Sequence, residues 1–243
     1  MPAPTTTTAS PERPTAQARL QQQLRIIALF EELPDADLAR VATACTTGSY
    51  ARHEQILGDH DATTDVFFVL SGTVRVNSYA ESGREVIFSE VGAGDIFGEF
   101  AAVDGLPRSA AVVAQSDCVL ARMPATKFLE ILRHNGAVSV HLVELLVAKI
   151  RRMSERVFEV SALAVRERVR RELLRLAAKG TEFRHGIVIR PAPTHYEIAA
   201  SIGSHREAVT REFNRLEEEQ IIEVRRQQIR IVDIARLREG DEA

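Results

Sequence analysis

Residues 194–216, THYEIAASIGSHREAVTREFNRL, contain the most specific pattern in the C-terminal third of the chain. It holds two helical patterns on either side of Gly203, a residue type that permits a tight turn. Each pattern opens with the residue types of a capping box, Thr194 with Glu197 and Ser204 with Glu207. Apolar side chains at helical spacing give the helices inward faces, formed by Ile198, Ala199, Ile202, Val209, Phe213 and Leu216. The stretch therefore predicts a helix-turn-helix.

The second helix of this stretch is expected to meet DNA. Its outward face carries Ser204, His205, Arg206, Glu207, Thr210 and Arg211. Arginine can pair bidentately with guanine, and glutamate can accept from the cytosine amino group. A solvated face rich in Arg and Glu is the alternative interpretation, but two capping patterns around a glycine turn favour a recognition helix. Behind it, IIEV (221–224) and IRIV (229–232) predict a β-hairpin wing.

Upstream of this region the composition and the spacing of apolar residues change. Residues 1–15, rich in Thr, Pro and Ala, are expected to form a disordered tail, and helical patterns follow from Ala16 and over 35–44. From about Tyr50 to Pro124, short apolar runs recur between turns that contain glycine. Such a run of short strands is typical of an antiparallel barrel or sandwich.

A long helix is expected after Asn135-Gly136. Its apolar residues follow a 3-4-3-4-3 spacing at Val143, Leu146, Ile150, Met153, Val157 and Val160. A strict two-position seam is typical of a helix that pairs with its own copy, so the pattern predicts a parallel homodimer. Packing of the seam against the barrel is the alternative.

Composition narrows the function classes. The 243 residues carry a net charge of −3, yet residues 165–230 hold 14 Lys/Arg against 10 Asp/Glu, which fits a nucleic-acid module there. Cys45 and Cys118 lack metal-ligand spacing and suit buried thiols in a reducing cytoplasm. No apolar run reaches the length of a membrane span, and no hydrolase, P-loop, zinc-protease or dinucleotide motif is present. Neither a membrane protein nor an enzyme is expected.

A second informative stretch is GDIFGEFAAVDGLPRSAAVVA, residues 94–114. Gly98 allows close backbone approach, and Glu99 and Arg108 bring opposite charges into one loop. An arginine beside exposed backbone N–H groups and the hydroxyl of Ser109 is the chemistry that holds a phosphate. A loop with an internal Glu–Arg ion pair is the plainer alternative.

This stretch resembles the phosphate-binding segment of cyclic-nucleotide-binding domains, and residues 20–235 as a whole resemble the CRP/FNR family of bacterial regulators. The resemblance implies an α+β fold with an N-terminal cyclic-nucleotide-binding β-barrel of the jelly-roll type, a long dimerisation helix and a C-terminal winged helix-turn-helix. The implied divisions are 1–15 for the tail, 16–135 for the nucleotide-binding domain, 136–163 for the dimerisation helix and 164–243 for the DNA-binding domain.

The resemblance also implies a function. Cyclic AMP or cyclic GMP, with no metal, would allosterically set the affinity of a homodimer for a palindromic, TGTGA-like site on double-stranded DNA. RNA polymerase is an expected partner, and the cytoplasm is the expected location. A CRP/FNR-type regulator that is ligand-independent or answers another effector is the alternative.

Individual residues take the family's roles by position. Glu99 would accept from the ribose 2′-hydroxyl near the Gly98 backbone, and Arg108 and Ser109 would hold the cyclic phosphate. Ser154 falls where the family has a base-contacting serine. On the DNA side, the resemblance implies that Arg206, Glu207 and Arg211 read bases.

Three positions depart from the family pattern. Met153 stands where cyclic-AMP-responsive members have an adenine-reading threonine, which weakens adenine selectivity and leaves cyclic GMP open, the more so because Ser109 could accept from the guanine amino group. Ala164 replaces an aspartate that caps the first helix of the DNA-binding domain, and Arg225–Gln228 lacks the usual glycine of the wing turn.

Overall fold

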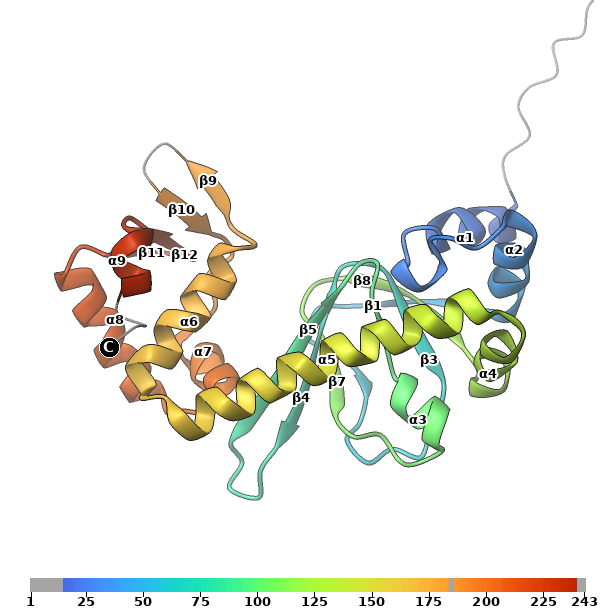
Figure 1. Ribbon diagram of the computed structural model, residues 1–243, viewed down its shortest axis with the longest axis horizontal. Coiled ribbons are helices and arrows are strands. Elements are labelled where there is room, and N and C mark those ends of the chain that lie inside the picture. Colours follow the sequence, from blue (N-terminus) through green and yellow to red (C-terminus); the bar gives the residue numbers. More distant parts are fainter. Residues whose placement is uncertain (1–14, 184–185, 240–243) are drawn as a thin grey trace, which may run out of the picture. The chain divides into compact units, whose positions relative to one another are not determined.

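The computed structural model describes residues 15–183 and 186–239 (Figure 1). The chain forms two compact units. One consists of the residues up to Val74 together with Val91–Leu142, and the other of Arg75–Glu90 together with the residues from Val143 onward. The expected N-terminal tail lies outside the described residues, except for Thr15. The hydroxyl of Thr15 accepts from the Ala18 N–H at 3.2 Å and so caps the first helix.

Helices and then eight strands form the N-terminal part of the chain. The helical segments are α1 (Ala16–Leu24), the short 3₁₀ helix η1 (Ala28–Phe30) and α2 (Asp35–Ala44). The strands are β1 (Thr46–Tyr50), β2 (Gln55–Leu57), β3 (Val66–Ser71), β4 (Thr73–Tyr79), β5 (Glu85–Gly92), β6 (Ile96–Phe97), β7 (Ala111–Ala114) and β8 (Cys118–Met123). They lie in two four-stranded sheets, ordered β1-β8-β3-β6 and β2-β7-β4-β5, as expected for a jelly roll.

The core of the first unit surrounds β3. The side chains of Val66–Leu70 are all buried, and β3 pairs antiparallel with β8 so that Phe68 faces Ala121. The ring of Phe68 lies 4.9 Å from that of Phe30 in η1 and 6.5 Å from that of Phe128, so the helical segments that carry these two residues share one core with β3. Cys45 and Cys118 are free and buried, as expected.

Two helices in the first unit were not expected from the sequence. The segment after Gly98 is helical, since Glu99–Asp104 forms α3, whereas the sequence pattern indicated a loop. Ala125–His134 forms α4, which anchors Phe128 and ends before α5. The long helix α5 runs over Gly136–Ala162, the length expected from the apolar seam.

The second unit contains the helix-turn-helix. Its elements after α5 are α6 (Val165–Ala177), β9 (Thr181–Phe183), β10 (Gly186–Ile189), α7 (His195–Ile202), α8 (Arg206–Glu218), β11 (Ile222–Arg225), β12 (Gln228–Ile231) and α9 (Ile234–Glu239). The strands form one sheet in the order β11-β12-β10-β9, so the expected wing hairpin β11–β12 is present and β9, β10 and α9 are additions to the expected pattern.

The core of the second unit lies where the inward faces of the helices meet. Leu173 of α6, Ile198 of α7 and Phe213 of α8 are each at most 1% exposed and belong to one apolar cluster. Gly203 ends α7 in the left-handed conformation, with φ of 63°, which confirms the predicted turn.

Only one of the two expected capping boxes forms. The Thr194 hydroxyl accepts from the Glu197 N–H, and the Glu197 carboxylate accepts from the Thr194 N–H. The second box, at Ser204, is wrong. The Ser204 N–H donates to the Ala199 carbonyl at 2.9 Å, so Ser204 still belongs to the C-terminal turn of α7, and the N-cap of α8 is His205.

Candidate functional site

Arg108 lies in the first unit, between the end of α3 and β7, and is almost wholly buried at 2% exposure. Its guanidinium donates three hydrogen bonds to the protein. Nε bonds to the Thr63 hydroxyl at 3.0 Å, Nη1 to the Gly98 carbonyl at 2.9 Å, and Nη2 to the Asp65 carbonyl at 2.8 Å. A guanidinium has five N–H groups, so the two terminal nitrogens each keep one further donor for a ligand.

The backbone of Arg108 is held as firmly as its side chain. The Arg108 N–H donates to the Asp61 carbonyl at 2.9 Å, and the His60 N–H donates to the Arg108 carbonyl at 3.0 Å. The segment before β3 thus holds both the backbone and the guanidinium of the arginine. Thr63 and Asp65, which complete this cradle, were not identified from the sequence, because they lie more than 40 residues away in a polar loop without a motif.

Gly98 is required by the cradle. Its φ is 83°, a conformation that favours glycine, and a Cβ atom built there would lie 2.8 Å from both Arg108 Nη1 and the Asp65 carbonyl oxygen. The next residue, Glu99, begins α3 and is 3% exposed. The structure therefore brings Gly98, Glu99 and Arg108 together, while Ser109 beside them is exposed.

The electrostatics of the cradle keep Arg108 charged. Burial lowers the pKa of its guanidinium, and the negative charges of Asp65, Asp61 and Glu99 oppose that shift. An arginine stays protonated even after such a shift. A buried, permanently charged donor set that retains free N–H groups and stands beside the exposed Ser109 fits a phosphate ester.

The expected seam on α5 is exposed in the second unit. Val143, Ile150, Met153, Val157 and Val160 are each at least 50% exposed. Ser154 is exposed beside them, and its hydroxyl donates to the Ile150 carbonyl at 3.0 Å. The parts of Met153 and Ser154 in ligand binding stay predictions. An uncovered apolar stripe of this length is typical of a helix that meets a partner.

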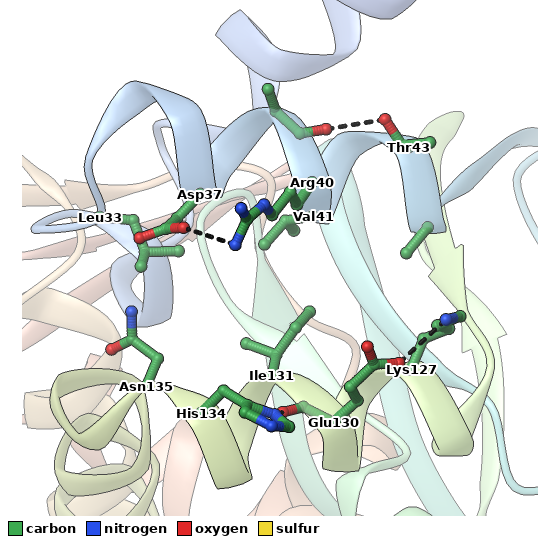
Figure 2. A pocket seen from close by; sticks show the side chains of 12 residues that line it. Leu33, Asp37, Arg40, Val41, Thr43, Lys127, Glu130, Ile131, His134 and Asn135 are labelled. Atoms are coloured by element: carbon green, nitrogen blue, oxygen red, sulfur yellow. Dashed lines mark hydrogen bonds and ion pairs between the residues drawn. The ribbon is translucent and has the colours of Figure 1, made fainter.

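A separate groove of about 660 Å³ lies between α2 and α4 in the first unit (Figure 2). Figure 2 shows Asp37 and Arg40 on one wall and Lys127 and Glu130 on the other. Each wall balances its own charge, since Arg40 lies 3.5 Å from Asp37 and Lys127 lies 2.9 Å from Glu130. With its charges paired, the groove offers no concentrated positive charge comparable to that of Arg108.

The face of α8 that is predicted to read DNA is largely exposed, as expected. His205, Arg206, Glu207 and Arg211 are exposed, and within the described residues the Arg206 guanidinium has no hydrogen bond or ion pair. Ser204 departs from the expectation because its side chain is only 7% exposed and so does not lie on the outward face. Thr210 is half-buried, and its hydroxyl donates to the Arg206 carbonyl at 2.9 Å.

Within the second unit, an ionic cluster joins α5, α6 and α7. Glu172 of α6 accepts from Arg156 at 2.9 Å, from Arg175 at 2.9 Å and from the Ser201 hydroxyl at 3.1 Å. Arg175 also donates to Glu159 at 2.7 Å. Burial alone would raise the pKa of Glu172, but the two arginines bring it below its ordinary value.

The described residues contain no cluster of three or more His, Cys, Asp or Glu side chains able to hold a metal ion. No described helix is both long enough and apolar enough to cross a membrane.

Known proteins match both halves of the chain. The family model of the cyclic nucleotide-binding domain matches residues 47–135, and that of the Crp-like helix-turn-helix domain matches residues 167–239. The chain is 30% identical over 182 residues to the cAMP-activated global transcriptional regulator CRP of Haemophilus influenzae, which covers 74% of this chain and 81% of that relative.

Two solved structures share the fold. A CooA mutant from Carboxydothermus hydrogenoformans has a TM-score of 0.73 at 22% identity, covering 84% of this chain and 90% of that one. The c-di-GMP responsive global regulator CLP of Xanthomonas campestris has a TM-score of 0.71 at 18% identity, covering 82% of this chain and 99% of that one. The predicted architecture, a nucleotide-binding sheet domain followed by helices and a helix-turn-helix domain, is confirmed.

Proposed function

Because the chain belongs to the CRP/FNR family of transcription regulators, we propose that a cyclic nucleotide held by Arg108 sets its affinity for a palindromic, TGTGA-like duplex. Family membership makes the chain a DNA-binding regulator with a cyclic-nucleotide-binding domain. The nucleotide-binding and DNA-binding parts are thus separate domains. Under the proposal, the protein binds the nucleotide without converting it. We propose that it acts in the cytoplasm. RNA polymerase is a further proposed partner.

The observation that carries the ligand proposal is the cradle of Arg108. Three acceptors of the protein aim the guanidinium before any ligand arrives, and Gly98 leaves the space that a side chain would fill. Preorganised charge is what an anionic ligand needs, because the protein then loses little entropy on binding. Glu99 would receive the ribose hydroxyl, and Ser109 would add a hydroxyl to the phosphate contacts.

The preferred nucleotide is cyclic AMP, with cyclic GMP as a second ligand. The relative in Haemophilus influenzae is cAMP-activated. Ser154 would accept from the adenine amino group, while Met153 supplies no hydrogen-bond donor and only a weak acceptor. We therefore propose modest discrimination, within about a thousandfold, which corresponds to roughly 4 kcal/mol.

A homodimer through α5 completes the proposal. The stripe of Val143, Ile150, Met153, Val157 and Val160 is too exposed for a stable monomer surface, and its spacing suits a second copy in parallel. Two copies of α8 related by a two-fold axis would read a palindrome.

An effector other than a cyclic mononucleotide, or none, is the second candidate. Arg108 already has protein partners for three of its donors, so it could be a purely structural residue. CLP, which shares the fold, responds to c-di-GMP, so the fold alone does not select a mononucleotide.

Calorimetric titration of the full chain with cyclic AMP and with cyclic GMP tests the ligand. DNA affinity is then measured with and without saturating nucleotide, on a duplex selected from random sequences. Under the proposal, nucleotide tightens DNA binding, and by linkage the duplex tightens nucleotide binding by the same factor. Equal DNA affinity in both conditions would favour the second candidate. Selection of an asymmetric site would contradict the two-fold dimer.

A further inference from the structure

His195 opens α7 and contacts the recognition helix α8 at two points. Its Nδ1 atom lies 2.9 Å from the Oγ1 atom of Thr210, and its ring centroid lies 4.5 Å from that of Phe213, with 52° between the planes. Phe213 is buried in the core of the unit, so this contact orients the imidazole. Thr210 belongs to the expected reading face. His195 therefore connects the core of the unit to that face.

The hydrogen bonds around Thr210 define which nitrogen of His195 carries a proton. A threonine hydroxyl has one proton and two lone pairs. The Arg206 carbonyl, 2.9 Å from the hydroxyl, can only accept, so the hydroxyl proton points to it. Both short contacts of Thr210 are then satisfied only if His195 Nδ1 is the donor. The result is a relay of two hydrogen bonds, from Nδ1–H to the hydroxyl and from the hydroxyl to the carbonyl of Arg206.

Burial, together with the nearby Arg206 cation, favours a neutral ring with that single proton. Burial lowers the pKa of His195, the Arg206 cation lowers it further, and Glu217 of α8 acts in the opposite direction. The relay does not depend on whether the ring is neutral or charged, because Nδ1 is a donor in the imidazolium as well.

We propose that His195 is a positioning residue for DNA reading, because its Nδ1–H holds the Thr210 hydroxyl against the Arg206 carbonyl and so sets the first turn of α8. Bidentate pairing of Arg206 with a guanine needs both N–H groups in one plane with the base. The Arg206 guanidinium makes no hydrogen bond or ion pair within the described residues, so its direction depends on the backbone that the relay fixes. This inference rests on the proposed DNA binding.

The test compares five variants of the full chain with saturating cyclic AMP, one of them the double variant His195→Phe/Thr210→Val. The reference duplex is the palindrome selected by the wild-type protein, and the second duplex lacks the guanine whose recognition is lost in Arg206→Ala. His195→Phe keeps a ring on Phe213 but has no donor, and Thr210→Val removes the hydroxyl. His195→Asn restores a donor, because its amide nitrogen stands as many bonds from the backbone as Nδ1 does. Tyr196→Phe, at the neighbouring exposed residue, is the matched control.

We expect the ratio of affinities for the two duplexes to fall about threefold to tenfold in His195→Phe and in Thr210→Val, the range of one ordinary hydrogen bond. The double variant should lose no more than either single one, because both break the same relay. His195→Asn and Tyr196→Phe should keep the wild-type ratio.

Three results would overturn the proposal: a wild-type ratio in Thr210→Val, additive losses in the double variant, or an Asn variant that behaves like Phe. Thr210→Val keeps the test valid even if thermal unfolding shows that His195→Phe is misfolded. A wild-type protein that selects no duplex at all contradicts the proposed function, and with it the role of His195.

Discussion

Arg108 and Arg206 are both expected to meet phosphate or base, yet their surroundings are opposite. Arg108 is 2% exposed and donates to Thr63, Gly98 and Asp65. Arg206 is exposed on the first turn of α8, and its guanidinium has no hydrogen bond or ion pair among the described residues. Under the proposed function, the first arginine is fixed before its ligand arrives, whereas the second would become fixed only on DNA.

The difference follows from what each site has to distinguish. A small anion offers few contacts, so a preorganised site must supply most of the orientation itself. A duplex offers a long surface of phosphates that positions the protein, and base-reading side chains then add discrimination. The stability of the protein should consequently depend on Arg108 and be indifferent to Arg206.

The largest effect is expected for Arg108→Leu. Loss of a charge-assisted contact should weaken cyclic-nucleotide binding at least about tenfold. The same substitution leaves the partly buried carbonyls of Gly98 and Asp65 and the exposed Thr63 hydroxyl without their donor. The three losses together should lower the free energy of unfolding by about 1–3 kcal/mol. Titration calorimetry and urea unfolding measure the two effects separately.

Arg122→Leu is the matched control for Arg108. Arg122 also approaches Asp65, at 3.4 Å, but its side chain is 56% exposed. It should change neither nucleotide affinity nor the free energy of unfolding by more than about 0.5 kcal/mol. If Arg108→Leu destabilises the protein while wild-type protein binds no nucleotide, Arg108 is a structural residue only.

Arg206→Ala should show the reverse pattern. We expect a loss of about 1–3 kcal/mol on the cognate duplex, with relaxed preference at one base position. The free energy of unfolding should stay within about 0.5 kcal/mol of wild type, since an exposed side chain without partners is removed. Arg215→Ala, on the same helix but paired with Glu219 at 2.8 Å, is the control and should keep the base preference. A large loss of stability in Arg206→Ala would contradict the contrast with Arg108.

The sequence predicted the parts of both sites that depend on local patterns. Thr194 and Glu197 are three residues apart, Gly203 permits a left-handed turn, and the α5 seam repeats regularly, so each could be recognised from spacing alone. Local patterns also predicted the short-stranded domain, the long helix and the helix-turn-helix, and the family resemblance added the jelly-roll topology and the nucleotide site. Thr63 could not be found in this way, because its contact with Arg108 is created by tertiary folding across 45 residues.

The errors have physical causes as well. Ser204 and Glu207 have the right types and spacing for a capping box, but the Ser204 N–H is already used to close α7. The sequence of α3 indicates a loop because the helix has only six residues and lies between Gly98 and Gly105, both with positive φ. Short helices between glycines are stabilised by their surroundings more than by their own sequence.

Within the DNA-binding half, the ionic cluster around Glu172 is expected to hold α5, α6 and α7 together. The variant Glu172→Gln tests this expectation. Loss of the charge between Arg156 and Arg175 should lower the free energy of unfolding by about 1–3 kcal/mol at neutral pH. The folded-state pKa of Glu172 is lowered, so its contribution is present above its ordinary value of 4.5 and disappears as the pH falls through the folded-state pKa. The wild type and the variant should therefore converge in acid.

Urea unfolding from pH 7 down to acid measures this difference, with Glu218→Gln, an exposed residue of α8, as control. Base preference should be unchanged in Glu172→Gln. A difference that grows as the pH falls would show that the carboxylate is not held in its charged form by the two arginines.

The smallest expected effect concerns two left-handed turns that flank the reading helix. Gln227 of the wing turn has φ of 57°, although it is not glycine, and its carbonyl accepts from the Ala192 N–H at 3.0 Å. Gly203 has φ of 63°, and a Cβ atom there would meet nothing closer than 3.4 Å, from Val160.

Gln227→Gly should relieve backbone strain of about 1–2 kcal/mol, while the added freedom of the unfolded chain cancels up to about 1 kcal/mol of it. A net gain near 0.5 kcal/mol follows, whereas Gly203→Ala should lose about 1 kcal/mol because the strain is then introduced. Thermal unfolding of both variants measures whether stability rises in Gln227→Gly and falls in Gly203→Ala. Loss of stability in Gln227→Gly would mean that the glutamine side chain, and not the turn conformation alone, supports the wing.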